Sequence, residues 1–387
     1  MRDSELLLRR VLAHPSLDGP RLIYADWLEE RGDPRGEFIR AQCALAQLPR
    51  ADSRRDELQT RVDELQKQHQ NEWVGSLKAL VTGWRFHRGF VDTVYVEARR
   101  FLSHADQLFE LAPIRHIHLL DVGRRINDVA EKPQLARLSS LTVFASHAGD
   151  SVACALAESP HLVNLLELNL GRNRIGAGGA TALAASHSLR RLALLDLTDN
   201  QIGDAGAHAL AASNNLAQVT TLGLAHNGCQ PNGVHALLTS SRLARLFSLK
   251  LADNAITQIM PLDDSTSMGK FRIIDLSGNG LDGAGIAPLV ACAHIRGLHT
   301  LNLNRNVLGD YGATILAQSP YLAGLRTLLL CDNRISDAGV RELAGSPHLA
   351  GLTTLTLSNN PIGDGGFQAL HDSPFLNRVS RLVSPDE

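Results

Sequence analysis

The sequence predicts an α/β solenoid, in which short parallel strands alternate with helices along a repeating chain. Three observations support this prediction: an asparagine recurs about every 27 residues, the same leucine spacing precedes each asparagine, and a helical pattern follows it. A fixed period of this length is typical of repeat arrays whose units stack on their neighbours. The asparagines are Asn173, Asn200, Asn227, Asn254, Asn279, Asn306, Asn333 and Asn360.

The strand of each repeat is predicted from its leucines. Leu165, Leu168 and Leu170 precede Asn173 in the phrase L-x-x-L-x-L-x-x-N, and the other copies follow the same spacing. Alternation at the end of this phrase indicates a short strand whose leucines point inward. The asparagine stands where the chain leaves the strand, next to buried backbone groups that need partners. We therefore expect the eight asparagines to form a structural ladder.

The helix of each repeat is predicted from the residues after the asparagine. In the better copies an aspartate, a glycine and a leucine follow at fixed distances, as at Asp204, Gly206 and Leu210. This pattern predicts an amphipathic helix that the aspartate caps at its N-terminus. A Ser-Pro pair such as Ser319-Pro320 often ends the helix, because proline opposes its continuation. One repeat is thus a strand, a turn, a helix and a second turn.

Weaker copies extend the array in both directions. They begin near Val91, Ile114 and Leu138 on one side and near Val379 on the other. We therefore expect a right-handed horseshoe with a parallel inner sheet of about twelve strands, outer helices and an α-helical N-terminal cap. From about residue 90 onward the motifs resemble the ribonuclease-inhibitor subclass of leucine-rich repeats, which implies that horseshoe.

The N-terminal segment shows no such period. Its patterns predict helices in residues 1–48, a helical connector or N-terminal cap in residues 49–88, and the repeat domain in residues 89–387. Residues 20–39, PRLIYADWLEERGDPRGEFI, resemble the bacterial repeat-companion domain, whose biochemical role is not established. The resemblance implies a bacterial source and an architecture but no reaction. A cap over the first core layer and an independent binding domain both remain open.

Composition indicates a soluble chain with no preference for polyanions. The 387 residues include 38 basic and 40 acidic side chains, so the excess of positive charge that phosphate neutralisation needs is missing. No apolar run is long enough to span a membrane, Arg9 and Arg10 interrupt the first apolar stretch, and the five cysteines show no paired spacing. We expect a cytoplasmic protein, with a monomer favoured, that binds neither nucleic acid nor membrane.

The search for chemistry predicts a protein that is not an enzyme. The sequence lacks the Walker, nucleophile-elbow, zinc-protease and paired C-x-x-C motifs. His116 and His118 alternate along a predicted strand and so point to one face, but a third metal ligand is not evident. A polar patch on a binding surface is the favoured interpretation of this pair. We expect neither a cofactor nor a metal.

Function is expected on the inner, concave strand face, where side chains between the buried leucines point outward. The sequence favours a protein–protein interaction scaffold, with an enzyme inhibitor or regulator, or a GTPase-activating protein by analogy with similar repeats, as alternatives. Aromatic anchors within a polar rim are typical of protein interfaces. Whether the helical cap buries the N-terminal part of this face stays open at this point. The candidate partner-binding residues are Tyr95, His116, His118, Leu120, Phe144, Asn169, Arg172, Asp196, Asp199, Lys250, Asp275, Asn302 and Arg305.

Overall fold

The computed structural model describes residues 2–49, 51–262, 266–379 and 381–383. The chain divides into two compact units. The first unit contains residues 1–146 and 159–167, and the second contains residues 147–158 and 168–387. The domain boundaries that the sequence suggests, after residues 48 and 88, stay predictions.

Four helices open the first unit, close to where the sequence predicts them. The Asp33 side chain accepts a hydrogen bond from the Arg35 backbone amide at 2.9 Å and so caps the third helix. Ser4, a residue type that often caps helices, does not cap the first helix, because that helix already begins at Arg2. The helices are α1 (Arg2–Ala13), α2 (Gly19–Glu29), α3 (Pro34–Gln47) and α4 (Arg54–Val74).

A β-hairpin that the sequence does not predict follows these helices. Strands β1 (Gly83–His87) and β2 (Phe90–Glu97) pair antiparallel through a turn at Arg88 and Gly89, whose φ angles of 50° and 82° suit a two-residue hairpin. A side chain at Gly89 would clash with Ile39 of helix α3. The turn therefore packs directly against the helical cap.

An aromatic core joins the helical cap to the hairpin. The ring of Phe38 lies 4.6 Å from that of Trp73 and 5.4 Å from that of Phe86, centroid to centroid. On the other side, Phe90 packs against the guanidinium groups of Arg21 and Arg35, at 5.1 and 4.9 Å from the ring centroid. These contacts fix the cap to the first strand of the repeat array.

The rest of the first unit continues the array with two irregular repeats. Strand β3 (His116–Leu120) pairs parallel with β2 and with β4 (Ser140–Val143). Helices α5 (Ala98–Leu111) and α6 (Ile126–Ala130) connect these strands.

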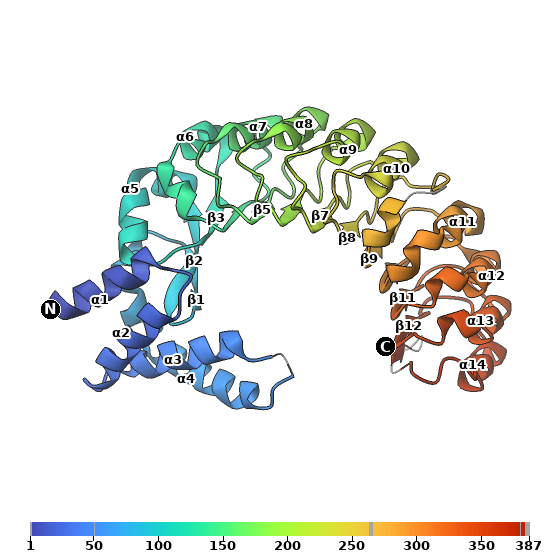
Figure 1. The fold of residues 1–387 in the computed structure, drawn as a ribbon, viewed down its shortest axis with the longest axis horizontal. Coiled ribbons are helices and arrows are strands. Elements are labelled where there is room, and N and C mark those ends of the chain that lie inside the picture. The colour runs from blue at the N-terminus through green and yellow to red at the C-terminus, as the bar shows by residue number, and fades with distance from the viewer. Residues whose placement is uncertain (1, 50, 263–265, 380, 384–387) are drawn as a thin grey trace. The chain divides into compact units, whose positions relative to one another are not determined.

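The second unit contains the regular repeats. Its strands follow one another in chain order in a parallel sheet, with their helices along the other side (Figure 1). Strands β2 to β13 are the twelve that the sequence predicts, so the α/β solenoid is confirmed within the described residues. The strands are β5 (Glu167–Asn169), β6 (Leu194–Asp196), β7 (Thr221–Gly223), β8 (Ser248–Lys250), β9 (Ile273–Asp275), β10 (Thr300–Asn302), β11 (Thr327–Leu329), β12 (Thr354–Thr356) and β13 (Arg381–Val383). The helices are α7 (Asp150–Glu158), α8 (Ala177–Ala185), α9 (Gly203–Ala211), α10 (Pro231–Thr239), α11 (Gly283–Ala291), α12 (Gly309–Gln318), α13 (Asp337–Ala344) and α14 (Asp364–His371).

The recurring asparagines bond one repeat to the next. The Oδ1 atom of Asn200 accepts hydrogen bonds from the backbone amides of Asn173 (3.0 Å) and Ile175 (2.9 Å) in the preceding repeat. Its amide nitrogen donates to the carbonyls of Leu170 (3.0 Å) and Leu197 (2.7 Å). Bonds of this kind recur at Asn227, Asn254, Asn279, Asn306, Asn333 and Asn360.

Two further ladders run along the turns, and one of them corrects the expected role of the aspartates. Asp204 does not cap its own helix: its Oδ1 atom accepts from the Gln230 backbone amide at 2.7 Å, at the start of the next helix. Asp310 bonds the amides of Ser336 and Gly339 in the same way. The serine hydroxyls donate backward instead, as from Ser213 to the Ala184 carbonyl at 2.5 Å. Several of the regular repeats are thus bonded to a neighbour at three levels.

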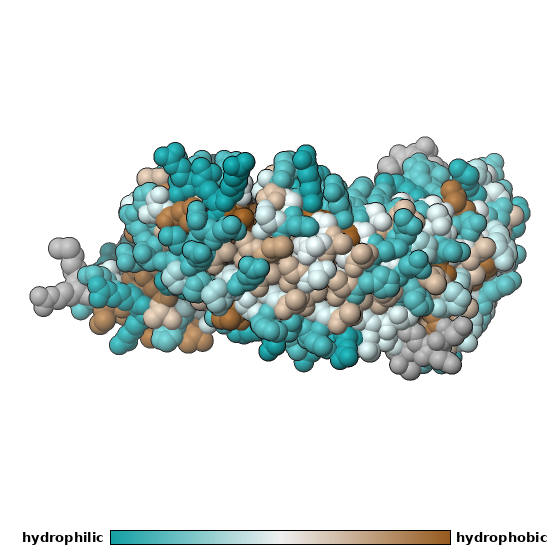
Figure 2. Space-filling model, turned by 90° about the horizontal axis from the view of Figure 1, so that it is seen from above, coloured by the Kyte–Doolittle hydropathy of each residue, from teal (hydrophilic) through white to brown (hydrophobic). Residues whose placement is uncertain are grey.

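Small residues let neighbouring helices of the second unit pack closely. Helices α7 to α10 show a band of small, weakly apolar residues bordered by hydrophilic ones (Figure 2). A Cβ atom added at Gly206 of α9 would lie 3.0 Å from the Cβ atom of Ala180 in α8. Larger residues at such positions would push the helices apart.

The repeat that begins at Asn254 departs from the pattern. Within its described residues it has no α-helix, only a 3₁₀ turn at Thr266–Lys270. Lys270 is half-buried there, and its Nζ atom donates to the Ser240 carbonyl at 2.6 Å. Burial lowers the pKa of Lys270 to about 8.

Replacing a ladder asparagine is expected to destabilise the array. In Asn200→Ala the amides of Asn173 and Ile175 lose their acceptor in a buried site, so unfolding should become easier by about 2–4 kcal/mol. Urea unfolding of the variant measures this cost. The exposed Asn232→Ala, on helix α10, is the control and should change stability by no more than about 0.5 kcal/mol. A similarly small change for Asn200→Ala would contradict the structural role of the ladder.

Lys270 is expected to make stability depend on alkaline pH. Its folded pKa of about 8 lies below its ordinary value of 10.5, so the unfolded chain holds this proton more firmly between these values. Stability should therefore rise as the pH increases from about 8 to 10.5. Thermal melts over this range should show a smaller rise for Lys270→Met than for the wild type or for Lys250→Met, whose lysine is exposed. Equal slopes in all three proteins would refute this assignment.

Candidate functional site

The strand face of the first unit carries two adjoining rows of large side chains. In the first row, Tyr95 of β2 pairs in register with His118 of β3, and their rings stack with centroids 4.3 Å apart and planes within 12°. In the second row, Leu120 ends β3 and Phe144 follows β4 directly. We call Tyr95, His118, Leu120 and Phe144 the aromatic patch.

The helical cap does not cover the aromatic patch. Leu120 keeps 37% and Phe144 47% of its surface exposed, and Tyr95 and His118 are half-buried. Ile117 and Leu119, which alternate with these residues, are 1% exposed. The question that the sequence leaves open is thus answered for this part of the face, because large apolar groups remain in contact with solvent.

The two histidines of β3 share a face but have different partners. His116 directs Nε2 to the carboxylate of the buried Asp92 at 3.3 Å, whereas His118 stacks on Tyr95. Within the described ranges, no three histidine, cysteine, aspartate or glutamate side chains come close enough together to hold a metal ion. Each imidazole is therefore engaged within the protein.

His118 is the electrostatically perturbed member of the aromatic patch. Burial against its neighbours lowers its pKa, and electrostatic interactions with Arg85 and with the His116 ring lower that pKa further. The Arg85 guanidinium also lies 5.8 Å from the centroid of the Tyr95 ring. The patch therefore presents a neutral imidazole beside one cationic side chain at neutral pH.

Many of the predicted polar residues in the second unit bond their own turns. Asp196 Oδ1 accepts from the Thr198 amide at 3.0 Å and from its hydroxyl at 2.6 Å. Asp275 bonds Ser277 in the same way, and Asn169 and Asn302 each accept from the backbone amide two residues later. Lys250, next to Asp275 in the sheet register, is exposed. The aspartates and asparagines stabilise the strand ends, so fewer of their hydrogen-bond acceptors are left for a partner.

The residue before each ladder asparagine takes a left-handed conformation. Arg172 and Asp199 have φ angles of 59° and 58°, and their side chains pair across neighbouring repeats at 2.9 Å. Because both side chains are well exposed, this ion pair contributes little to stability. The turn nevertheless directs a row of charged groups toward solvent.

One glycine in this row allows a contact between charges two repeats apart. Arg305 reaches Asp253 at 2.6 Å, and His226 approaches the same carboxylate at 3.2 Å. Gly278 lies between Asp253 and Arg305, and a Cβ atom there would clash with the Asp253 carboxylate. The predicted site residue Arg305 is therefore already neutralised by Asp253.

Sequence reasoning misses two residues that contact the predicted site residues of this strand face, Arg85 beside Tyr95 and Asp92 beside His116. Arg85 belongs to the unpredicted strand β1, and Asp92 lies among apolar residues that are ordinary core positions. An aspartate within a strand of valines is the one signal for the buried partner of His116, because a buried carboxylate needs a partner.

Comparison with known proteins identifies the repeat. A family model described as Leucine Rich repeat matches residues 161–184, 186–211 and 351–370. The chain therefore contains leucine-rich repeats. No curated protein sequence matches it.

Several solved structures are similar to this chain at low sequence identity. An internalin from Listeria monocytogenes is 17% identical over 76% of this chain and 87% of its own, with a TM-score of 0.44. A TLR13–ssRNA13 complex gives 18% identity over 72% of this chain and 34% of its own, with a TM-score of 0.37. The yeast Rad7 and Elc1 complex gives 14% identity over 91% and 88%, with a TM-score of 0.40. In the part of the chain that the structure describes, no helix is long and apolar enough to cross a membrane.

The pKa of His118 is expected to respond to Arg85. Its folded pKa lies below the ordinary 6.5, so stability should fall as the pH drops from 6.5 toward that folded value. Removing one repelling charge in Arg85→Gln should raise the pKa, while burial should keep it below 6.5. An NMR titration of the His118 imidazole measures its pKa in the wild type and in Arg85→Gln. The exposed Arg99→Gln is the control. An unchanged midpoint in Arg85→Gln would contradict the electrostatic coupling.

Proposed function

We propose that the protein is a non-catalytic scaffold that binds another protein through the aromatic patch on the concave strand face of its first unit. The observation that supports this proposal is the exposure of Leu120 and Phe144 beside the stacked Tyr95 and His118. Large side chains held by a sheet lose little conformational entropy when a partner covers them. Such residues are typical centres of protein interfaces.

The surroundings of the aromatic patch complete a typical interface. Arg85 lies beside the Tyr95 ring, Glu97 is the register neighbour of Leu120, and Thr142 is the register neighbour of His118. An apolar centre within a polar rim excludes water from the central contacts, which strengthens them. Binding of a partner involves no chemical step, so it needs no catalytic group and only the surface of these strands.

The architecture proposed for the chain is a repeat-companion segment in residues 1–48, a connector in residues 49–88 and ribonuclease-inhibitor-like repeats in residues 89–387. The proposed setting is the bacterial cytoplasm. The free cysteines support a reducing compartment, since Cys43, Cys229 and Cys292 are buried as single thiols. Burial raises the pKa of Cys43 to about 11, which keeps that thiol protonated and unreactive.

Site-specific crosslinking tests the proposed surface. A photoreactive benzoylphenylalanine at position 144 should crosslink one discrete protein in the cells that encode this chain. The same group at position 163 should not, although Val163 is equally exposed at 46%. The captured protein is then purified and its affinity measured by calorimetry.

The affinity measurement distinguishes a specific interface from an adhesive apolar surface. Truncation of Tyr95 and Phe144 to alanine should weaken binding by about 2 kcal/mol or more, which is about thirtyfold. Val163→Ala should leave the affinity within about twofold of the wild type, as expected for a residue outside the interface. Equal crosslinking from both positions, or full affinity in the Tyr95/Phe144 variant, would overturn the proposed site.

A further inference from the structure

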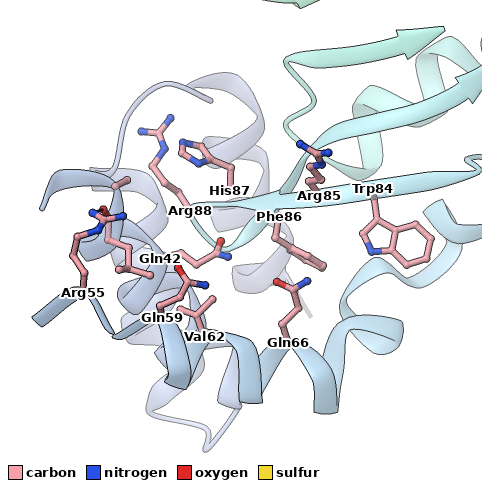
Figure 3. A pocket seen from close by; sticks show the side chains of 12 residues that line it. Gln42, Arg55, Gln59, Val62, Gln66, Trp84, Arg85, Phe86, His87 and Arg88 are labelled. Carbon is pink, nitrogen blue, oxygen red and sulfur yellow. Dashed lines mark hydrogen bonds between the residues drawn. The ribbon is translucent and has the colours of Figure 1, made fainter. Parts of the chain in front are cut away.

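A groove in the first unit is lined by residues outside the aromatic patch, although Arg85 borders both. It has a volume of ≈ 440 Å³ and runs between helices α3 and α4 and the β-hairpin (Figure 3). Helix α4 contributes Arg55, Gln59, Val62 and Gln66, a spacing that places them on one face of the helix. The opposite wall is residues 84–88 of β1 and the hairpin turn.

Five consecutive residues in this wall show that the groove follows the edge of strand β1. A pocket against one face of a strand is lined by alternate residues, because successive side chains point to opposite faces. Here Trp84 and Phe86 point toward helix α4, while Arg85 projects to the other side of the strand (Figure 3). Both faces border the groove, so the backbone of β1 lies along it.

The edge of β1 that faces the groove has no strand partner within the described residues. β1 stands at the end of the strand order and pairs only with β2. An edge strand directs alternate N–H and C=O groups outward, where another chain can bond them. At the hairpin turn these groups are already used, since Arg21 donates to the Arg88 carbonyl and Gln42 accepts from the Gly89 amide. The available stretch is therefore Trp84 to His87.

The walls of the groove match a short extended segment in length and an acidic one in charge. Arg55 to Gln66 spans about 16 Å along α4, and Trp84 to Arg88 spans about 13 Å. Each length corresponds to about four or five extended residues. The lining contains Arg55, Arg85 and Arg88 but no carboxylate. Arg88 pairs with Asp18 outside the lining, whereas Arg55 bonds the Leu45 and Leu48 carbonyls.

We propose that this groove binds an extended acidic segment of another protein, which adds as a strand to the free edge of β1. Backbone hydrogen bonds to Trp84–His87 would supply affinity that does not depend on sequence, as in other strand-addition complexes. Arg55 and Arg85 favour acidic side chains by charge complementarity. The three glutamine side chains of the lining supply further hydrogen-bond donors from the helical wall.

Peptide binding to the full chain tests the proposal. The probe is a fluorescent, end-capped hexapeptide of alternating valine and glutamate, and binding is followed by anisotropy. A lysine version tests charge, and a version with methylated backbone nitrogens tests strand addition, because it keeps the side chains but loses the donors. We expect the glutamate peptide to bind, and each altered peptide to bind about tenfold more weakly or less. Hydrogen exchange of residues 84–87 should slow on binding.

A matched pair of variants locates the site. Gln66→Glu adds a negative charge to the groove wall and should weaken the glutamate peptide about fivefold. Gln68→Glu adds the same charge to the same helix outside the lining and should change binding less than twofold. Equal binding of the methylated peptide, equal weakening by both variants, or no saturation at millimolar peptide would overturn the proposal. Stronger binding of single-stranded oligothymidylate would do so as well, in favour of nucleic acid.

Discussion

The structure depends on the need to satisfy buried backbone groups where each strand ends. A repeat of this size does not close its own turn, because the amides of Asn173 and Ile175 bond Asn200 of the following repeat. At the start of a helix, the Gln230 amide likewise needs Asp204 of a neighbouring repeat. At the end of a helix, the Ala184 carbonyl accepts from Ser213 of the next repeat. A single repeat would leave these groups unpaired, so stability is a property of neighbouring pairs.

The asparagine ladder also determines which side chains are exposed on the strand face. To direct the asparagine inward, the preceding residue takes a left-handed conformation that costs about 1–2 kcal/mol for most residues. Asp199 and Asp253 suit this position better than bulky side chains do. The polar groups of the regular repeats are thus largely committed to their own turns. In the first unit the corresponding ladder positions hold Val122 and Ser146, and there the exposed groups are Leu120 and Phe144 instead. The aromatic patch lies where the ladder asparagines are missing.

The sequence predicts the features that depend on local patterns, and it misses those that form only when repeats stack. The leucine spacing predicts all twelve parallel strands, because the inward-facing alternation is local. Strand β1 escapes prediction, since it belongs to no repeat and its aromatic residues also suit a cap. The role of Asp204 escapes too, because its partner amide at Gln230 becomes a neighbour only when repeats stack. The stack of Tyr95 on His118 likewise requires the register of two strands, which the sequence leaves implicit.

Strand β1 solves one problem of an open sheet and creates another. It covers the edge of β2, yet its own outer edge is left as a template on which any extended chain could pair. Arg85 on this strand discourages edge-to-edge pairing of two copies, because like charges would meet. The same charge does not discourage an acidic chain. An edge protected in this way is therefore selective, and the flanking face of helix α4 restricts further what can lie along it.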